Sequence, residues 1–517
     1  MTPARAGRPI SRLEAGARAA RARTARPVQL VWTLRQAWRR RRAAPLYREL
    51  FAAGEYLPVP PTAPARVLFS VVMPVHRVAA AHLREAIDSV RGQTHDGWEL
   101  IIVADGPPDP AVERAIADAA LHEPRVRVLR RAATGGIAIA SDDGIAAARG
   151  DFVAFLDHDD LLHPRALEIV ARQLALTPDA DWLFTDEDVI DEEGLHARPC
   201  VKPGWSRHLL LSFNYVAHLR VVRRAALEHV GRHRPGLDGA QDYDLALRVL
   251  AAGGRFVHVP GVLYHWRSVA TSMARGGAAK PEALDRAKRA LRDHLEGLVP
   301  ETVPSIRLLV ASAALFASRV HPHAPVRAFD LPAGSNDDPQ GLVEHARRAN
   351  ADVVFCPGPG MLDADDRAEL AALLLVPGTA LAAARQRRRC RVASSGFLAG
   401  SAGRLVDPWA GIPTADPGYM NLALMPGRRL APPPGGWMAR RDAVVAAWDA
   451  ASDEAPQWRL WRGFERLGLE VVTSPVAYLK TRNHRPCPSP PSAAQPMWQT
   501  AWLERLGLAD WRPGERR

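Results

Sequence analysis

The sequence predicts an α/β protein with a mostly parallel sheet flanked by helices, and two observations carry this prediction. From residue 67 onward, short runs rich in β-branched residues alternate with longer amphipathic runs. The longer runs are long enough to form helices, so successive strands should return in the same direction through right-handed crossovers. The 517 residues, 47% apolar, are sufficient for about two to four domains with complete cores.

The expected elements follow one another in a regular order. Each expected strand is a short apolar run, and each expected helix has apolar residues at helical spacing. In chain order we expect strands over 67–75, 99–103, 126–129 and 152–156, separated by helices over 82–93, 111–121 and 136–149. The carboxyl ends of parallel strands meet at one crevice, so Asp105 and Asp157, which follow the second and fourth strands, should face the same site.

The most distinctive local feature is the acidic run Asp157-His158-Asp159-Asp160 at the end of a buried strand. Adjacent carboxylates raise one another's pKa values and repel, and a divalent cation that holds a diphosphate relieves this repulsion. An acidic turn that caps a helix beginning near Pro164 explains the same residues. Local features alone leave both interpretations open.

The phosphate-binding motifs of common nucleotide sites are missing from the sequence. No G-x-G-x-x-G follows the first strand, and no G-x-x-x-x-G-K-[ST] loop occurs anywhere. A metal held by the acidic run would supply the contact with phosphate in another way, because Mg²⁺ and Mn²⁺ combine one or two carboxylates with substrate phosphates.

Further polar residues stand at the ends of later elements, around Lys202, Asp242 and His265. Each has a structural interpretation beside the functional one. Asp242 could be a helix N-cap, and His265 and Trp266 could be ordinary core residues.

Taken as an ordered set, these motifs resemble family 2 glycosyltransferases over about residues 67–300. The matching segments are Ser70–Val75, Ile102–Gly106, Gly135–Ile137, Ala154–Asp160, Gln241–Leu245 and Tyr264–Arg267. The resemblance implies a GT-A fold, a nucleotide-sugar donor at the first strand ends and inversion at the anomeric carbon in one displacement.

The resemblance also implies roles for individual residues. Asp157 and Asp159 are similar to the D-x-D pair that holds a divalent metal, Mn²⁺ or Mg²⁺, with the donor diphosphate, and His265 is the expected further metal ligand. Asp242 resembles the general base. The expected nucleotide contacts are Pro74, Val75, Asp105, Gly136 and Asp157, and the expected contacts with donor or acceptor are Lys202, Gln241, Trp266 and Arg267.

A second, altered copy of this fold is expected downstream. Residues 351–370 echo residues 151–170 at a constant offset of 200, and in this register Pro357 and Pro359 replace Asp157 and Asp159. Two later echoes keep the same order: Ala439–Asp442 matches Val222–Ala225, and Val476–Tyr478 matches Val262–Tyr264 with Leu479 in place of His265. The segment Ala455–Gln457 stands around the Asp242 position without a carboxylate. A chance match of apolar strings is the alternative, but three echoes in one order favour a degenerate, truncated GT-A-like domain.

The positive charge of the chain is concentrated at its beginning. Residues 1–48 contain 13 arginines and one glutamate, which leaves 55 basic and 55 acidic side chains in the remainder. We expect this arm to contact an anionic membrane surface through interleaved apolar residues, with a disordered tail as the alternative and no binding of nucleic acid. No apolar stretch reaches the length of a membrane span or a secretory signal, and four widely spaced cysteines favour a reducing cytoplasm.

Four regions are therefore expected: an arginine-rich arm and linker (1–65), a catalytic GT-A domain (66–300), a degenerate GT-A-like domain (301–482) and a tail rich in Pro and Trp (483–517). The expected function is metal-dependent, inverting transfer of a hexose or deoxyhexose to a glycan or lipid-linked acceptor in cell-surface polysaccharide synthesis. The tandem arrangement resembles O-antigen or rhamnan-type enzymes. The expected location is the cytoplasm, with peripheral attachment at the inner face of the plasma membrane as an extension. The alternative is a non-catalytic protein that binds nucleotide sugars or serves as a scaffold.

Overall fold

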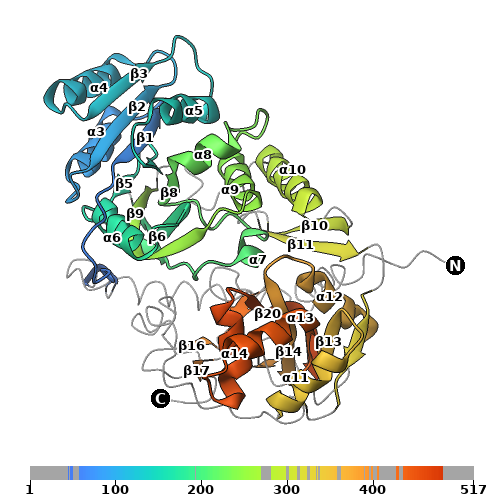
Figure 1. The fold of residues 1–517 in the computed structure, drawn as a ribbon. Coiled ribbons are helices and arrows are strands. Elements are labelled where there is room, and N and C mark those ends of the chain that lie inside the picture. Colours follow the sequence, from blue (N-terminus) through green and yellow to red (C-terminus); the bar gives the residue numbers. More distant parts are fainter. Residues whose placement is uncertain are drawn as a thin grey trace.

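The computed structural model shows two α/β domains, one above the other in Figure 1. We call them the first and second domains. The structure describes residues 45, 47–49, 57–191, 194–268, 281–298, 302–310, 315–322, 326–332, 335, 338–357, 362–388, 391–394, 398–399, 405–406, 427–429 and 435–480. The arginine-rich arm up to residue 44 and the tail from residue 483 lie outside these residues, as does Pro359.

The first domain is built on a nine-stranded sheet with the order β3-β2-β1-β4-β8-β6-β9-β5, and β7 pairs with β6. Strands β1, β2, β3 and β4 run parallel, while β8 runs antiparallel to both of its neighbours. The strands are β1 (Phe69–Val75), β2 (Trp98–Ala104), β3 (Val126–Arg130), β4 (Phe152–Phe155), β5 (Leu161–Leu162), β6 (Trp182–Ile190), β7 (His196–Cys200), β8 (Arg220–Arg223) and β9 (Phe256–Arg267).

Helices cover both faces of this sheet (Figure 1). The helices are α3 (Ala80–Arg91), α4 (Pro110–His122), α5 (Ile137–Ala147), α6 (Ala166–Leu176), α7 (Arg207–Leu210), α8 (Arg224–Val230), α9 (Gln241–Ala251) and α10 (Pro281–Leu298). Helix α4 begins where Asp109 accepts hydrogen bonds from two backbone amides and Pro110 occupies the first turn. Helix α5 approaches β1 closely because Gly144 has no Cβ, which would lie 2.4 Å from a methyl carbon of Val72.

The predicted strands and helices between residues 67 and 156 are all present, and most of their boundaries lie within two residues of the predicted ones. The strands of this region are central and strongly apolar, so their pattern is distinctive. All seven residues of β2 are buried, as expected for a parallel strand covered on both faces. The GT-A arrangement, a mostly parallel sheet flanked by helices, is confirmed.

The second domain is built on a seven-stranded sheet with the order β12-β13-β19-β14-β20-β18, and β15 pairs with β14. Its strands are β12 (Ala328–Asp330), β13 (Val353–Cys356), β14 (Thr379–Arg388), β15 (Arg391–Ser394), β18 (Gly427–Arg429), β19 (Trp437–Arg440) and β20 (Glu470–Lys480). Its helices are α11 (Pro339–Arg348), α12 (Ala364–Leu374), α13 (Arg441–Ala450) and α14 (Pro456–Arg466), and β16 (Leu398–Ala399) pairs with β17 (Leu405–Val406).

The second sheet repeats the topology of the first. The order β12-β13-β19-β14-β20 corresponds to β1-β4-β8-β6-β9, and every neighbouring pair has the same relative direction in both sheets. Strand β15 is antiparallel to β14 as β7 is to β6. Counterparts of β2 and β3 do not occur among the described residues of this sheet, which is therefore the shorter one.

The structural register between the two copies differs by one residue from the offset of 200. The carboxylate of Asp151 accepts from the backbone N–H of Leu68, and its carbonyl accepts from that of Arg224. Asp352 makes the same two contacts with Arg327 and Arg441. The offset in β13 is therefore 201. Strands buried on both faces carry no alternation, so apolar matching could not separate the two registers.

This shift corrects two predicted equivalences. Continued along the sequence, an offset of 201 places Gly358 and Gly360, rather than two prolines, at the positions of Asp157 and Asp159; both glycines lie outside the described residues. At the other strand ends, Asp188 pairs with His265 between β6 and β9, and the corresponding pair between β14 and β20 is Arg387 with Lys480. Lys480, and not Leu479, therefore stands at the His265 position.

Two segments near the predicted domain boundaries belong to the first domain. Tyr47 is fully buried and donates a hydrogen bond to Asp188, so part of the predicted arm and linker is docked. The hairpin of β10 (Thr302–Val310) and β11 (Leu315–Pro322) contributes Ile306 and Phe316 to the core that contains Val72 and Trp182. The boundaries at residues 65 and 300 remain a proposal.

Candidate active site

The candidate site lies at the carboxyl ends of β1, β2 and β4, where parallel strands leave a crevice. Asp105 directly follows β2 and is 4% exposed. Its two oxygens accept hydrogen bonds of 2.8 Å from the backbone amides of Gly135 and Gly136, and Arg131 lies 3.0 Å away as an ion pair. Asp105 therefore holds the loop that leads into α5, and its predicted contact with the nucleoside stays a prediction.

The backbone of the neighbouring strand β1 makes two contacts at this crevice. The carbonyl of Val75 accepts from the amide of Asp105 at 2.9 Å, and the carbonyl of Pro74 lies 2.9 Å from Nδ1 of His158. The predicted nucleotide-contacting residues Pro74, Val75, Asp105 and Gly136 thus lie along one connected edge. Their contact with a nucleotide remains a prediction.

Within the acidic run, Asp160 is the structural member. It is 1% exposed, accepts from the hydroxyl of Tyr264 at 2.6 Å and accepts from the amide of Arg267 at 2.8 Å. Burial and the charges of Asp157 and Asp159 raise the pKa of Asp160 well above its ordinary value, and these hydrogen bonds offset only part of the effect. Asp160 therefore fastens the acidic loop to the end of β9.

Arg267 completes this attachment. Its Nε donates to the carbonyl of Asp159 at 2.8 Å, and its guanidinium forms an ion pair with Glu85. Its predicted contact with substrate would therefore come from a side chain that already holds the loop in place. That contact stays a prediction.

Asp157 and Asp159 differ from Asp160 in both exposure and partners. Both side chains are partly exposed, and no described residue donates a hydrogen bond to either carboxylate. Among the described residues, two acidic side chains thus lie beside a buried third acid without a donor of their own. Hard oxygen ligands of this kind fit Mg²⁺ or Mn²⁺, which supports the predicted pair as a metal site.

His265 lies in a different cluster from the one the sequence predicts. It is 3% exposed, and its Nδ1 lies 2.7 Å from Asp188, whose other oxygen lies 2.8 Å from Nδ1 of His196. Among the described residues, Asp188, His196 and His265 are the one group of at least three His, Cys, Asp or Glu side chains with ligand atoms within 4.8 Å of one another. Asp157 and Asp159 do not belong to it.

The histidine cluster orients the imidazole of His265. The contact of Nδ1 with Asp188 fixes the ring, as in the carboxylate–histidine pairs that support metal-binding histidines. Burial pushes the pKa of Asp188 upward, but the charges and hydrogen bonds of His265 and His196 outweigh it and bring the pKa below its ordinary value. Asp188 thus remains a carboxylate.

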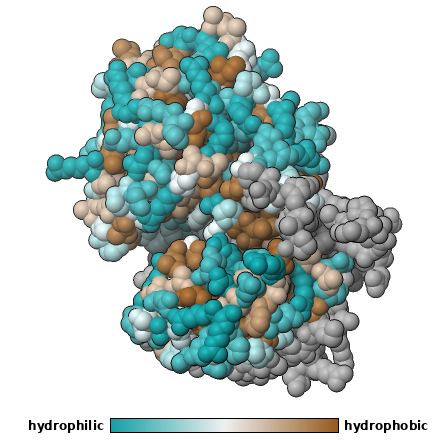
Figure 2. All heavy atoms as spheres, turned by 45° about the vertical axis from the view of Figure 1, so that its right-hand side comes forward, coloured by the Kyte–Doolittle hydropathy of each residue, from teal (hydrophilic) through white to brown (hydrophobic). Residues whose placement is uncertain are grey.

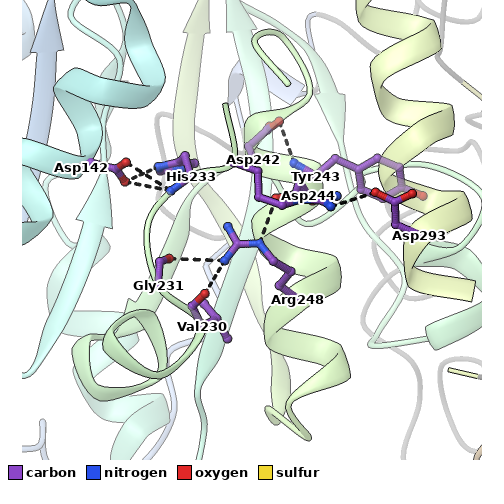
Figure 3. Close-up of polar contacts among 10 residues, drawn as sticks. Asp142, Val230, Gly231, His233, Asp242, Tyr243, Asp244, Arg248 and Asp293 are labelled. Atoms are coloured by element: carbon purple, nitrogen blue, oxygen red, sulfur yellow. Dashed lines mark hydrogen bonds and ion pairs between the residues drawn. The ribbon is translucent and has the colours of Figure 1, made fainter. Parts of the chain in front are cut away.

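Asp242 lies in the first turn of α9, partly exposed. Its Oδ2 accepts a hydrogen bond of 2.9 Å from Nδ2 of Asn214, and its Oδ1 accepts from the amide of Tyr243. In Figure 3 its carboxylate points away from the ion pair of Asp244 with Arg248 farther along the same helix. A carboxylate that is partly exposed and held by two neutral donors suits a general base.

Asp244 anchors the base helix. It is 1% exposed and forms ion pairs with Arg248 and Arg234, and Arg234 also reaches Asp293 of α10. Figure 3 shows Arg248 bridging from Asp244 to the carbonyls of Val230 and Gly231. The first turn of α9 is therefore fixed to two neighbouring segments.

A buried pair links the donor side of the crevice to the base side. Asp142 of α5 accepts from the amide of His233, and their side chains meet at 2.7 Å (Figure 3). Since α5 begins just after Gly136 and His233 precedes α9, this pair sets the distance between the two halves of the candidate site.

The remaining predicted contact residues have internal partners. Lys202 is 2% exposed, and its ammonium group donates to Glu187 at 2.9 Å and to the carbonyl of His218. Its expected contact with substrate stays a prediction. Gln241 accepts from the amide of Gly239 at 2.6 Å. The ring of Trp266 lies 5.7 Å from that of His218.

Comparison with known proteins relates one part of the chain to a known family. The model of "Glycosyl transferase family 2" matches residues 70–231, from β1 to the end of α8. Residues 70–231 form a family 2 glycosyltransferase domain. This domain holds Asp105, Asp157 and Asp159, while Asp242 and His265 follow it in the same sheet and its helices.

Two relatives are similar to nearly half of this chain. "Uncharacterized protein y4gI" of Sinorhizobium fredii is 42% identical over 241 residues, which cover 46% of this chain and 26% of that protein. "O-antigen biosynthesis protein RfbC" of Myxococcus xanthus is 43% identical over 230 residues, covering 44% of this chain and 18% of that protein. The chain thus spans about a quarter or less of the length of these relatives. The crystal structure of S. aureus TarS 1-349 has a TM-score of 0.34 and 17% identity, covering 45% of this chain and 72% of that chain.

Several residues of the glycosyltransferase domain and its surroundings had not been assigned from the sequence. Asp188 stands in the acidic run 186–188, which signals a site without saying which acid faces it. Asn214 and Tyr47 carry no local signal, because an isolated Asn in a loop and a Tyr in a basic segment fit no motif. Only the fold brings them to Asp242 and Asp188.

Proposed function

We propose that this chain is a metal-dependent, inverting glycosyltransferase that moves a sugar from a nucleotide-sugar donor to a hydroxyl of a glycan or lipid-linked acceptor. Two observations carry the proposal. Asp157 and Asp159 are partly exposed carboxylates to which no described residue donates a hydrogen bond, and Asp242 is a separately held carboxylate. The first arrangement suits a diphosphate with its cation and the second suits a base.

On the donor side, Asp157 and Asp159 would hold a divalent cation through their carboxylate oxygens. His265 belongs to the separate cluster with Asp188 and His196, and the further metal contact expected of it stays a prediction. When bound, the cation neutralises the charge of the departing diphosphate. Asp160 and Arg267 act indirectly, since they fix the loop that presents the two carboxylates. Pro74, Val75, Asp105 and Gly136 form the edge on which the nucleoside would rest.

On the acceptor side, Asp242 accepts the proton of the attacking hydroxyl while the new C–O bond forms at the anomeric carbon and the bond to the diphosphate breaks. The hydrogen bond from Asn214 fixes the orientation of this carboxylate. Positioned base catalysis of this kind contributes about 10²–10⁴-fold to the rate.

The similarity to the O-antigen biosynthesis protein of Myxococcus xanthus supports a polysaccharide product of the cell surface. We further propose hexose or deoxyhexose as the transferred sugar. None of the helices in the described part of the chain is long and apolar enough to cross a bilayer. Because residues 1–48 contain 13 arginines, we propose attachment of this arm to anionic lipids at the cytoplasmic face of the membrane, where a lipid-linked acceptor would be present.

The test uses the full chain with Mn²⁺ and a panel of nucleotide sugars, with released nucleoside diphosphate and product stereochemistry as readouts. Asp242→Asn should lower kcat at least about 10²-fold with donor binding retained, and Asp159→Asn should remove metal-dependent donor binding. Donor binding without turnover by the unaltered protein would favour the alternative, a non-catalytic protein that binds nucleotide sugars. Turnover by Asp159→Asn equal to that of the unaltered protein would exclude the metal site.

A further inference from the structure

The second domain docks against the first through the short helix α7. The backbone amide of Arg207 donates to Glu470 at 3.2 Å, and Nε2 of His208 lies 2.7 Å from the hydroxyl of Thr379. Thr379 and Glu470 are register partners that begin β14 and β20. His208 and Thr379 are 3% and 1% exposed, so this contact is buried between the domains.

The joint continues on both sides of that contact. Val376, just before β14, packs in the apolar core of the first domain. The amide of Phe316 in β11 donates to the carbonyl of Ser212, and Arg319 of the same strand forms a buried ion pair with Glu369 of α12. Figure 1 shows α7 and β11 at the junction of the two domains, and Figure 2 shows hydrophobic residues gathered near that junction.

The same short segment contacts the base helix. The carbonyl of Leu210 accepts from the hydroxyl of Tyr243 at 2.6 Å, and Asn214 donates to Asp242 at 2.9 Å. Residues that contact the second domain and residues that contact the first turn of α9 therefore occur together within the eight positions 207–214. None of these four contacts involves Asp105, Asp157 or Asp159.

We propose that the second domain, which has lost the carboxylates of the active copy, serves as a positioning domain for the general base of the first. It acts by fixing the segment 207–214, which in turn orients Asp242 through Asn214 and Tyr243. This inference rests on the proposed role of Asp242 as the base. Small displacements of a catalytic group cost large factors in rate, so a contact that fixes the segment 207–214 can control kcat.

The test removes the interdomain contact at one atom. Thr379→Val keeps the shape of the side chain and takes away the hydroxyl that faces His208, and Thr379→Ser restores that hydroxyl. We expect kcat for transfer to fall about tenfold or more in Thr379→Val and to recover in Thr379→Ser, with KM for the nucleotide sugar within about twofold. The matched control is Ser335→Ala, which removes a buried hydroxyl elsewhere in the second domain, bonded to the carbonyl of Pro332.

A double-mutant cycle tests whether the interdomain contact acts on Asp242 through Asn214. If the contact acts through Asn214, the effects of Thr379→Val and Asn214→Ala on kcat should be strongly non-additive. Unchanged kcat in a folded Thr379→Val protein, or equal losses in Thr379→Val and Ser335→Ala, would overturn the positioning role. If the unaltered protein transfers no sugar, the proposed function itself is wrong. If the protein is active but the effects of the two substitutions on kcat are additive, only the positioning proposal is wrong.

Discussion

The hydroxyl of Tyr47 lies 2.5 Å from Oδ2 of Asp188, and both side chains are fully buried. Asp188 also holds Nδ1 of His196 and of His265. A residue of the segment that precedes the glycosyltransferase domain therefore completes the hydrogen bonding of the carboxylate that orients a predicted metal ligand. The segment is part of the candidate site as well as an extension of the arm.

Tyr47→Phe should lower the free energy of unfolding by about 1–3 kcal/mol, because Oδ2 of the buried Asp188 carboxylate loses one of its hydrogen-bond partners and keeps His196. Urea unfolding of the full chain measures this change.

The arm is best tested by two deletions that differ in whether Tyr47 is kept. A deletion of residues 1–44 keeps Tyr47 and should release the protein from anionic liposomes without loss of stability. A deletion of residues 1–48 removes Tyr47 and should destabilise the protein. Equal stability of the two deletions would contradict a structural role for Tyr47.

Asp244→Asn should be among the most destabilising single changes in the first domain. The substitution leaves Arg234 and Arg248 without their shared buried partner, and breaking such a pair costs about 3–5 kcal/mol. Both arginines are partly exposed, so solvent screening places the expected loss near the lower end, about 3 kcal/mol. Asp293→Asn is the control: it removes an ion pair with the same Arg234 at the surface and should cost less than about 1 kcal/mol. Equal losses in chemical denaturation would refute the anchoring role.

The fold of the first domain could be predicted because its strands and helices have different periods. The acidic run shows where that reasoning stops. The sequence alone does not distinguish Asp157, Asp159 and Asp160. In the structure only Asp160 of the three is buried in the core, where it contacts Tyr264. A turn has no sequence period from which the direction of a side chain can be read, so the division between metal ligands and a structural acid required the fold.

The same limit explains the shifted register of the second copy. β13 has four buried residues, Val353–Cys356, and either alignment matches apolar residues with apolar residues. The polar contacts of Asp352, which stands in the place of Asp151, determine the register.

Asn214 could not be predicted for another reason. Its partner Asp242 is 28 residues away, and the pairing depends on how α7 and α9 are packed.

The contact between the two domains should weaken in acid. Burial, aided by the charges of Arg319 and Arg207, lowers the pKa of His208 to about 3 from 6.5. The folded protein therefore binds fewer protons at this site than the unfolded chain between these values, so its contribution to stability is complete above about pH 6.5 and is lost as the pH falls below it. His208→Gln should flatten this part of the pH dependence of the free energy of unfolding, measured between pH 7 and 5. An identical slope in the variant would show that other histidines account for it.

One Mn²⁺ site per chain is expected, although the chain contains two copies of the fold. In the second copy, the strand positions that correspond to Asp188 and His265 hold Arg387 and Lys480, and neither residue type is a usual ligand of Mn²⁺. Titration of the full chain with Mn²⁺, followed by electron paramagnetic resonance, should give one bound ion, and Asp159→Asn should abolish it. Asp449→Asn, which removes a surface carboxylate of the second domain, serves as the control and should leave the count at one. Two sites of similar affinity, or a site that survives Asp159→Asn, would show that the metal binds elsewhere than at the loop after β4.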